Sequence, residues 1–207
     1  MTLRPVISGF AVAAVFWFFM FSPWTAGSAN FWLTMSIAAT TLVVWSLFND
    51  RKELGALYGF RPKWIAIGLV AAGLLYLVFF AGDRISALLF EFSKPQVEGI
   101  YSTKSQASPA LIGVLLFLLI GPAEEIFWRG FAQRRLQQHV GAWKGFLLTT
   151  AVYALVHIWA FNFMLLMAAL ICGLFWGWMY LKYKSVWPGL ISHAVWDLFI
   201  FVIIPIQ

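Results

Sequence analysis

The sequence predicts an all-α, polytopic integral membrane protein with about seven transmembrane helices in one bundle. Of its 207 residues, 62% are hydrophobic and only 11% are charged, whereas a typical soluble domain has about 25% charged residues. Apolar runs of about 20 residues, the length that spans a bilayer, recur from one end to the other. No polar stretch is long enough for a second domain, so we treat residues 1–207 as a single transmembrane domain.

Seven apolar segments account for the predicted spans. In chain order they cover about 6–21, 31–48, 64–82, 109–134, 143–159, 163–182 and 187–207. The first segment also resembles a signal peptide, but its bulky aromatic side chains and the immediate start of the next segment favour a retained span. We expect a short interfacial helix over 85–92 and a tilt or kink at Gly121-Pro122.

The charged loops predict how the chain is oriented. With a cytoplasmic amino terminus, ten Lys and Arg residues fall on the cytoplasmic side and three on the other. The ten are Arg4, Arg51, Lys52, Arg61, Lys63, Arg134, Arg135, Lys144, Lys182 and Lys184; the three are Arg84, Lys94 and Lys104. This bias fits the positive-inside rule, so it explains the net charge of +6 without a nucleic-acid partner. The loop 49–63 is then cytoplasmic and the connection 83–108 lies opposite.

Three full charges lie inside the fourth predicted span, at Glu124, Glu125 and Arg129. A charge near the bilayer centre costs about 2.5 to 3.5 kcal/mol, so unpaired charges without a function are not expected there. Glu125 and Arg129 are four residues apart and share one helix face. Glu124 points about 100° away from that face. We expect Arg129 to neutralise Glu125 and leave Glu124 facing a polar cavity.

Other ionisable residues lie in later predicted spans. His157 is in the fifth span, and His193 and Asp197 are four residues apart in the seventh. Each has a structural explanation when taken singly, such as a hydrogen bond between helices. Together the acids and histidines come from three helices at compatible depth, which is typical of a functional site. The single cysteine, Cys172, cannot form an internal disulfide, and Gly173 with Gly177 predicts a close helix contact.

Three motifs in fixed order carry a family resemblance. They are Glu124-Glu125-x-x-x-Arg129, Tyr153-x-x-x-His157 and His193-x-x-x-Asp197. This set resembles the CPBP family, which comprises the CAAX prenyl endopeptidases of the Ras-converting type and the bacteriocin-processing or immunity proteins, also called Abi. The resemblance covers about the last hundred residues, so we interpret 109–207 as the catalytic core and 1–108 as accessory spans.

The resemblance implies intramembrane proteolysis. Glu124, assisted by His157, would act as general base on a water molecule that attacks the scissile carbonyl. His193 with Asp197 would bind the oxyanion or orient the group that does, and Glu125 with Arg129 would complete the site. The family motif usually has Phe in place of Tyr153 and often Asn in place of Asp197. A carboxylate repels an oxyanion unless it is protonated. Asp197 is therefore less suited to bind the oxyanion than the more usual Asn.

Two points of mechanism and function stay open at this stage. Glu and His can ligate zinc, but the histidines lie on separate helices, and we favour a metal-free glutamic mechanism with no cofactor. A proton-coupled transporter or channel is the alternative from another class, and a non-catalytic immunity or interaction protein is a third. We expect a membrane-associated protein or peptide as substrate, the lipid bilayer as surroundings, and the inner (plasma) membrane as location.

Overall fold

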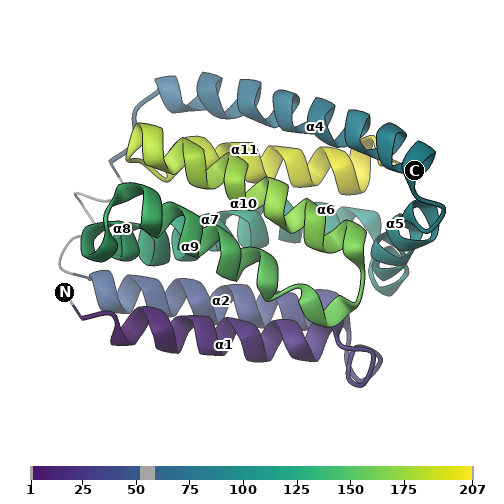
Figure 1. Ribbon diagram of the computed structural model, residues 1–207, viewed down its shortest axis with the longest axis horizontal. Coiled ribbons are helices and arrows are strands. Elements are labelled where there is room, and N and C mark those ends of the chain that lie inside the picture. Colours follow the sequence, from purple (N-terminus) through teal and green to yellow (C-terminus); the bar gives the residue numbers. More distant parts are fainter. Residues whose placement is uncertain (1, 52–58, 207) are drawn as a thin grey trace.

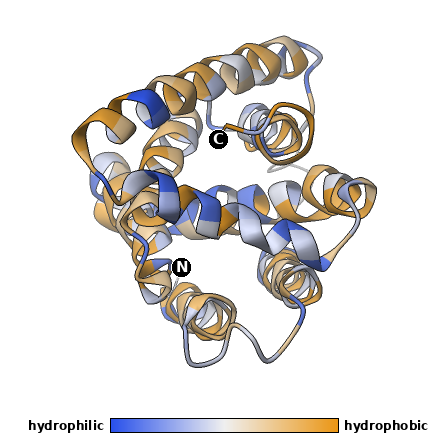
Figure 2. Cartoon of the chain, turned by 90° about the vertical axis from the view of Figure 1, so that its right-hand side faces the viewer, coloured by the Kyte–Doolittle hydropathy of each residue, from blue (hydrophilic) through white to orange (hydrophobic). Residues whose placement is uncertain are grey.

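The structure, a computed structural model, describes residues 2–51 and 59–206, which form one helical bundle without strands (Figure 1). Its elements are α1 (Arg4–Phe21), α2 (Phe31–Asp50), α4 (Lys63–Leu89), α5 (Ser93–Tyr101), η1 (Ser102–Gln106), α6 (Pro109–Leu115), η2 (Leu116–Ile120), α7 (Gly121–Glu125), η3 (Ile126–Gln133), α8 (Arg134–Val140), α9 (Ala142–Leu155), η4 (Ile158–Ala160), α10 (Phe163–Tyr183), α11 (Trp187–Leu198) and η5 (Phe199–Ile203). The predicted all-α class is confirmed. The long helices are mostly hydrophobic (Figure 2), as expected for an integral membrane protein.

Five helical segments in the described part of the chain are long and apolar enough to cross a membrane: α1, α2, α4, the continuous stretch Pro109–Val140, and α10. Helix α9 has only 14 residues, and α11 with η5 is a shorter apolar helix. The predicted count of seven spans is therefore not confirmed. The two termini nevertheless lie at opposite ends of the bundle (Figure 1), as they do after an odd number of passes.

Helix α4 is longer than the predicted third span. It continues seven residues beyond Gly82 to Leu89, so Asp83 lies inside it. The Asp83 carboxylate, which was predicted to lie in the connection 83–108, is balanced by Lys94 at 3.0 Å. The predicted interfacial helix over 85–92 is wrong, because its first five residues belong to α4. The short helix at this end is instead α5, which follows an extended residue at Phe90.

The fourth segment runs from α6 to α8 without a break, although it contains Gly121-Pro122. Wider π-helical turns, η2 and η3, lie on both sides of α7. In η2 the N–H of Gly121 bonds to the carbonyl of Leu116, five residues earlier. Such turns accommodate a proline without ending the helix, and they are frequent at functional sites. The helix type therefore changes at the predicted position, on both sides of the short helix α7 that carries Glu124 and Glu125.

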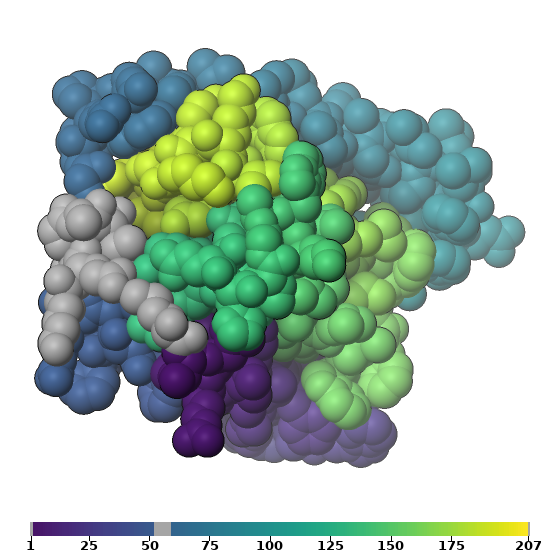
Figure 3. All heavy atoms as spheres, turned by 60° about the vertical axis from the view of Figure 1, so that its left-hand side comes forward, coloured from purple at the N-terminus to yellow at the C-terminus, as the bar shows by residue number. Residues whose placement is uncertain are grey.

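The basic end of the bundle is closed by buried ion pairs. Arg134 and Arg135 were predicted to leave the membrane, but both are buried, and each has a nitrogen 2.7 Å from Oδ1 of Asp50. Figure 3 shows the amino-terminal residues, α8 and the start of α11 beside one another on this end. Lys52 and Glu53, which belong to the predicted loop 49–63, lie outside the described residues.

Helices α9 and α10 approach closely at two glycines. A Cβ atom on Gly173 would lie 3.1 Å from the Thr150 side chain, and one on Gly177 would lie 2.8 Å from Phe146. The predicted packing at this pair is confirmed. A Cβ atom on Gly173 would also lie 3.2 Å from the ring of Tyr153 in α9.

Candidate active site

A carboxylate with no exposed surface lies at the centre of the site. The Glu125 side chain is 0% exposed, and its Oε1 accepts hydrogen bonds from Arg129 Nη1 at 2.9 Å and from His193 Nδ1 at 3.0 Å. The predicted pair of Glu125 and Arg129 is therefore present. His193 joins it from α11, so one carboxylate holds two helices together.

Aromatic rings surround the Arg129 guanidinium. Its carbon Cζ lies 4.7 Å from the ring centroid of Tyr153 and 5.5 Å from that of Trp176. Its Nη2 donates to the backbone oxygen of Cys172 at 3.3 Å. The Trp176 ring also stacks on His193, with centroids 3.7 Å apart and planes 19° apart. Arg129 and His193 are thus fixed by packing as well as by charge.

Glu124 faces a cavity, as predicted, but it is neither free nor in a polar environment. Its Oε2 accepts a hydrogen bond of 3.0 Å from the Tyr153 hydroxyl. The usual Phe of the family motif could not make this bond. The cavity has a volume of about 480 Å³ and mainly apolar walls. Its polar side chains at this level are Glu124, Tyr153, His157, His193 and Asp197.

His157 lies in the turn after α9, and both of its ring nitrogens are engaged. Nδ1 is 2.9 Å from the backbone oxygen of Tyr153, and Nε2 is 2.9 Å from Nε1 of Trp17. A carbonyl oxygen only accepts and an indole N–H only donates, so the proton lies on Nδ1 and the ring is neutral. His157 supports Glu124 through Tyr153 in this arrangement, and neither ring nitrogen is left to bind water.

The predicted pair of His193 and Asp197 on α11 is present, but the two side chains are not hydrogen-bonded. His193 Nε2 lies 3.5 Å from Oδ2 of Asp197, which is ion-pair distance rather than a hydrogen bond. Glu125 and Asp197 therefore flank the His193 ring at its two nitrogens. Both His193 and Asp197 line the cavity, at the same level as Glu124.

The region that contains these residues is similar to a known protein family. Residues 106–199 match the family model described as type II CAAX prenyl endopeptidase Rce1-like. This region is Rce1-like. The resemblance to the CPBP family is confirmed for it, and the match supports a membrane protease of the CAAX type in general. Searches of curated proteins and of solved structures gave no match.

The Rce1-like region contains all six predicted site residues, and the structure brings them together. They are Glu124, Glu125, Arg129, His157, His193 and Asp197. The division into a core over 109–207 and accessory spans over 1–108 stays a prediction. One accessory residue, Trp17, nevertheless bonds directly to His157.

The arrangement does not fit a metal centre. Within 2–51 and 59–206, no group of three or more His, Cys, Asp and Glu side chains is placed to hold a metal ion. The lone pair of His157 is used by Trp17, and His193 Nδ1 is used by Glu125. Zinc binding by His157 would require its ring to turn away from Trp17, and we derive no chemical step from a metal.

Three residues of the site were not predicted from the sequence. Trp17 fixes His157, and Trp176 stacks on His193. A Cβ atom on Gly189, in the first turn of α11, would lie 2.7 Å from Oε2 of Glu125, so a larger residue there would displace that carboxylate. The sequence gives no signal for the two tryptophans among its 12. The glycine follows Trp187-Pro188, which marks only a helix start.

We expect Trp17→Phe to weaken the site through His157. The substitution keeps an aromatic ring but removes the N–H, which leaves Nε2 of His157 buried without a donor. Such a loss costs about 1 to 3 kcal/mol of unfolding free energy. It should also shift the ¹⁵N resonance of His157 Nε2 and reduce cleavage. Thermal unfolding, ¹⁵N NMR with labelled histidine and the cleavage assay measure the three effects.

Trp45→Phe is the matched control. Its indole donates to the backbone oxygen of Pro5 at 3.0 Å, so it also ties α1 to another element, but away from the site. It should lower stability without moving the His157 resonance or the cleavage rate. Unchanged resonance and cleavage in Trp17→Phe would contradict a positioning role for Trp17.

Proposed function

We propose that this protein is an intramembrane endopeptidase in which Glu124 activates the attacking water. The observation that carries the proposal is the placement of Glu124 at an apolar cavity, beside His193 and Asp197 and apart from the paired Glu125. The Rce1-like match supports a peptidase of this general type. The substrate is a peptide segment of a membrane-associated protein, cleaved in or near the membrane.

The proposed reaction consumes one water molecule. Glu124 takes a proton from the water as its oxygen bonds to the scissile carbonyl carbon. The bond from that carbon to nitrogen then breaks, and Glu124 returns the proton to the departing amine. Tyr153 holds Oε2 of Glu124 at 3.0 Å, which leaves the other carboxylate oxygen for the water. His157 acts as a positioning residue, because its Nδ1 proton bonds to the Tyr153 backbone.

His193 is the proposed donor to the developing oxyanion. Its Nδ1 proton is directed at Glu125, since a carboxylate only accepts hydrogen bonds. In the imidazolium form Nε2 also donates, on the side where Asp197 lies. Asp197 then positions the ring and balances its charge, rather than binding the oxyanion as the more usual Asn could. Trp176 keeps the ring in one plane.

We also propose how the protein is oriented in the membrane. Arg51, Arg61, Lys63, Lys144 and Lys182 are among the basic residues near one end of the bundle, and the positive-inside rule makes that end cytoplasmic. The amino terminus is then cytoplasmic, and the inner (plasma) membrane is the proposed location.

Mass spectrometry of membrane proteins tests the proposed activity. Cells with the wild-type protein should contain new peptide termini near membrane spans, and cells with Glu124→Gln should lack them. Metal content and chelator sensitivity are measured on the same purified protein. Chelator-sensitive activity with near-stoichiometric zinc would replace the metal-free mechanism. Absence of any wild-type cleavage would favour the proton-coupled transporter.

A further inference from the structure

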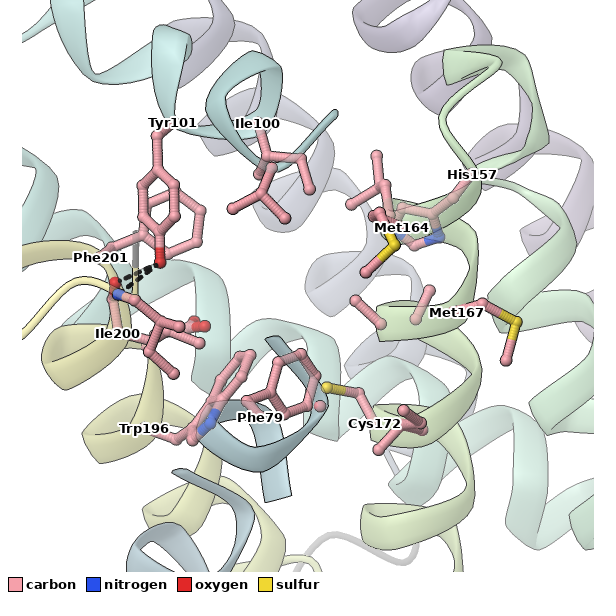
Figure 4. Close-up of a pocket in the computed structure, with 18 of the residues that line it drawn as sticks. Phe79, Ile100, Tyr101, His157, Met164, Met167, Cys172, Trp196, Ile200 and Phe201 are labelled. Carbon is pink, nitrogen blue, oxygen red and sulfur yellow. Dashed lines mark hydrogen bonds between the residues drawn. The ribbon is translucent and has the colours of Figure 1, made fainter. Parts of the chain in front are cut away.

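The cavity beside Glu124 extends toward one end of the bundle only. Its lining comes from helix ends that meet there (Figure 4). They are the start of α2 (Phe31, Trp32, Met35), the end of α4 (Gly82, Asp83, Ser86), α5 (Val97, Ile100, Tyr101), the start of α10 (Phe163, Met164, Met167) and the end of the chain (Ile200, Phe201, Ile206). The cavity therefore leads from the acidic residues toward α5.

The opposite direction is blocked. From Glu124 toward the basic end, η3 and α8 carry side chains that are almost fully buried, among them Arg129, Phe131 and Gln133. Gln133 donates to the backbone oxygen of Gly177 at 2.8 Å. The pairs of Arg134 and Arg135 with Asp50 follow. No cavity-lining residue in the described ranges belongs to this end of the bundle.

The two ends of the bundle also differ in charge. Arg84, Lys94 and Lys104 near the cavity end are balanced by Asp83, Glu91 and Glu98, whereas the other end is strongly basic. The orientation proposed above makes the basic end cytoplasmic. The cavity then opens on the non-cytoplasmic side of the membrane.

Helix α5 covers the cavity at this end and is attached at three places. Lys94 pairs with Asp83 of α4, and Gln96 bonds through its side chain to the N–H of Met164 at 3.0 Å. The Tyr101 hydroxyl donates to the backbone oxygen of Ile200 at 2.8 Å. Burial raises the pKa of Tyr101 to about 12, so this donor keeps its proton at neutral pH.

We propose that the substrate is an apolar, extended segment of a membrane protein that reaches Glu124 from the non-cytoplasmic side, past α5. This inference rests on the proposed function and adds the direction and chemistry of the substrate. The apolar walls favour apolar side chains, and the volume of about 480 Å³ is in the range of binding sites for small ligands or short segments. Val97 and Ile100 of α5 contact the segment from one side.

Cysteine labelling in right-side-out vesicles tests the direction of access. Each engineered cysteine is placed in the Cys172→Ala background, so that it is the only thiol, and a charged, membrane-impermeant thiol reagent is added outside. Ala168→Cys probes the cavity wall, and Leu174→Cys, on the same helix but outside the cavity, is the matched control. Glu98→Cys and Arg61→Cys report the two ends, since both residues are exposed.

We expect labelling of Ala168→Cys and Glu98→Cys from outside, and none of Leu174→Cys or Arg61→Cys. A bulky reagent on Ala168→Cys should also stop cleavage relative to the untreated variant. Failure of Ala168→Cys to react from outside overturns the proposal, whether or not it reacts from inside. Met167→Cys replaces it if that variant does not fold. Labelling needs no catalysis, so failure of the proposed protease activity is recognised separately by Glu124→Gln.

Discussion

Glu124→Gln should reduce peptide cleavage by about 100-fold or more while the protein remains folded. Glutamine has nearly the same size as glutamate, and its amide oxygen can still accept the hydrogen bond from the Tyr153 hydroxyl at 3.0 Å. It cannot take a proton from water, so the attacking hydroxide is no longer formed. The rate is measured on purified protein with a peptide identified by mass spectrometry, together with binding of that peptide, which should persist.

Glu98→Gln is the control for this loss. It makes the same chemical change at an exposed glutamate of α5, outside the cavity lining. Its cleavage rate and unfolding temperature should equal those of the wild type. Retained cleavage in Glu124→Gln would defeat the assignment of Glu124 as the base, with or without a metal.

Glu125→Gln should instead destabilise the whole protein. Removing one partner of a buried ion pair typically costs about 3 to 5 kcal/mol, because the other charge stays buried without compensation. Here both Arg129 and His193 lose their charged partner, and the Glu125 side chain has no exposed surface. We expect low yield, a lowered unfolding temperature in detergent and lost cleavage. Normal stability with only cleavage lost would mean that Glu125 is not primarily structural.

Two further variants test the cause of this destabilisation. Asp83→Asn breaks the pair with Lys94, whose side chain is 39% exposed, and should cost much less. The double variant Glu125→Gln, Arg129→Met removes the uncompensated charge as well. It should be less destabilised than the sum of the two single variants, because the residues form one network.

Sequence spacing predicted which ionisable side chains lie beside one another on the same helix. The i,i+4 relation placed Glu125 beside Arg129 and His193 beside Asp197, and the structure has both pairs, at 2.9 Å and 3.5 Å. Long apolar runs predicted the all-α membrane bundle. The predicted boundaries were wrong where tertiary contacts stabilise a longer helix. Asp83 was placed in the connection 83–108, but it lies in α4, where Lys94 of α5 balances its charge.

The sequence by itself determined the helical class, the order of the motifs and which charges share a helix face, because the period of the α-helix fixes these locally. Only the tertiary structure decided that Glu125 binds His193, that Trp17 occupies His157, and that Gly189 leaves room for the carboxylate. These contacts join residues far apart in the chain, and they depend on the rotation and depth of each helix. Close packing of side chains across the bundle sets both, and helical periodicity contains no information about either.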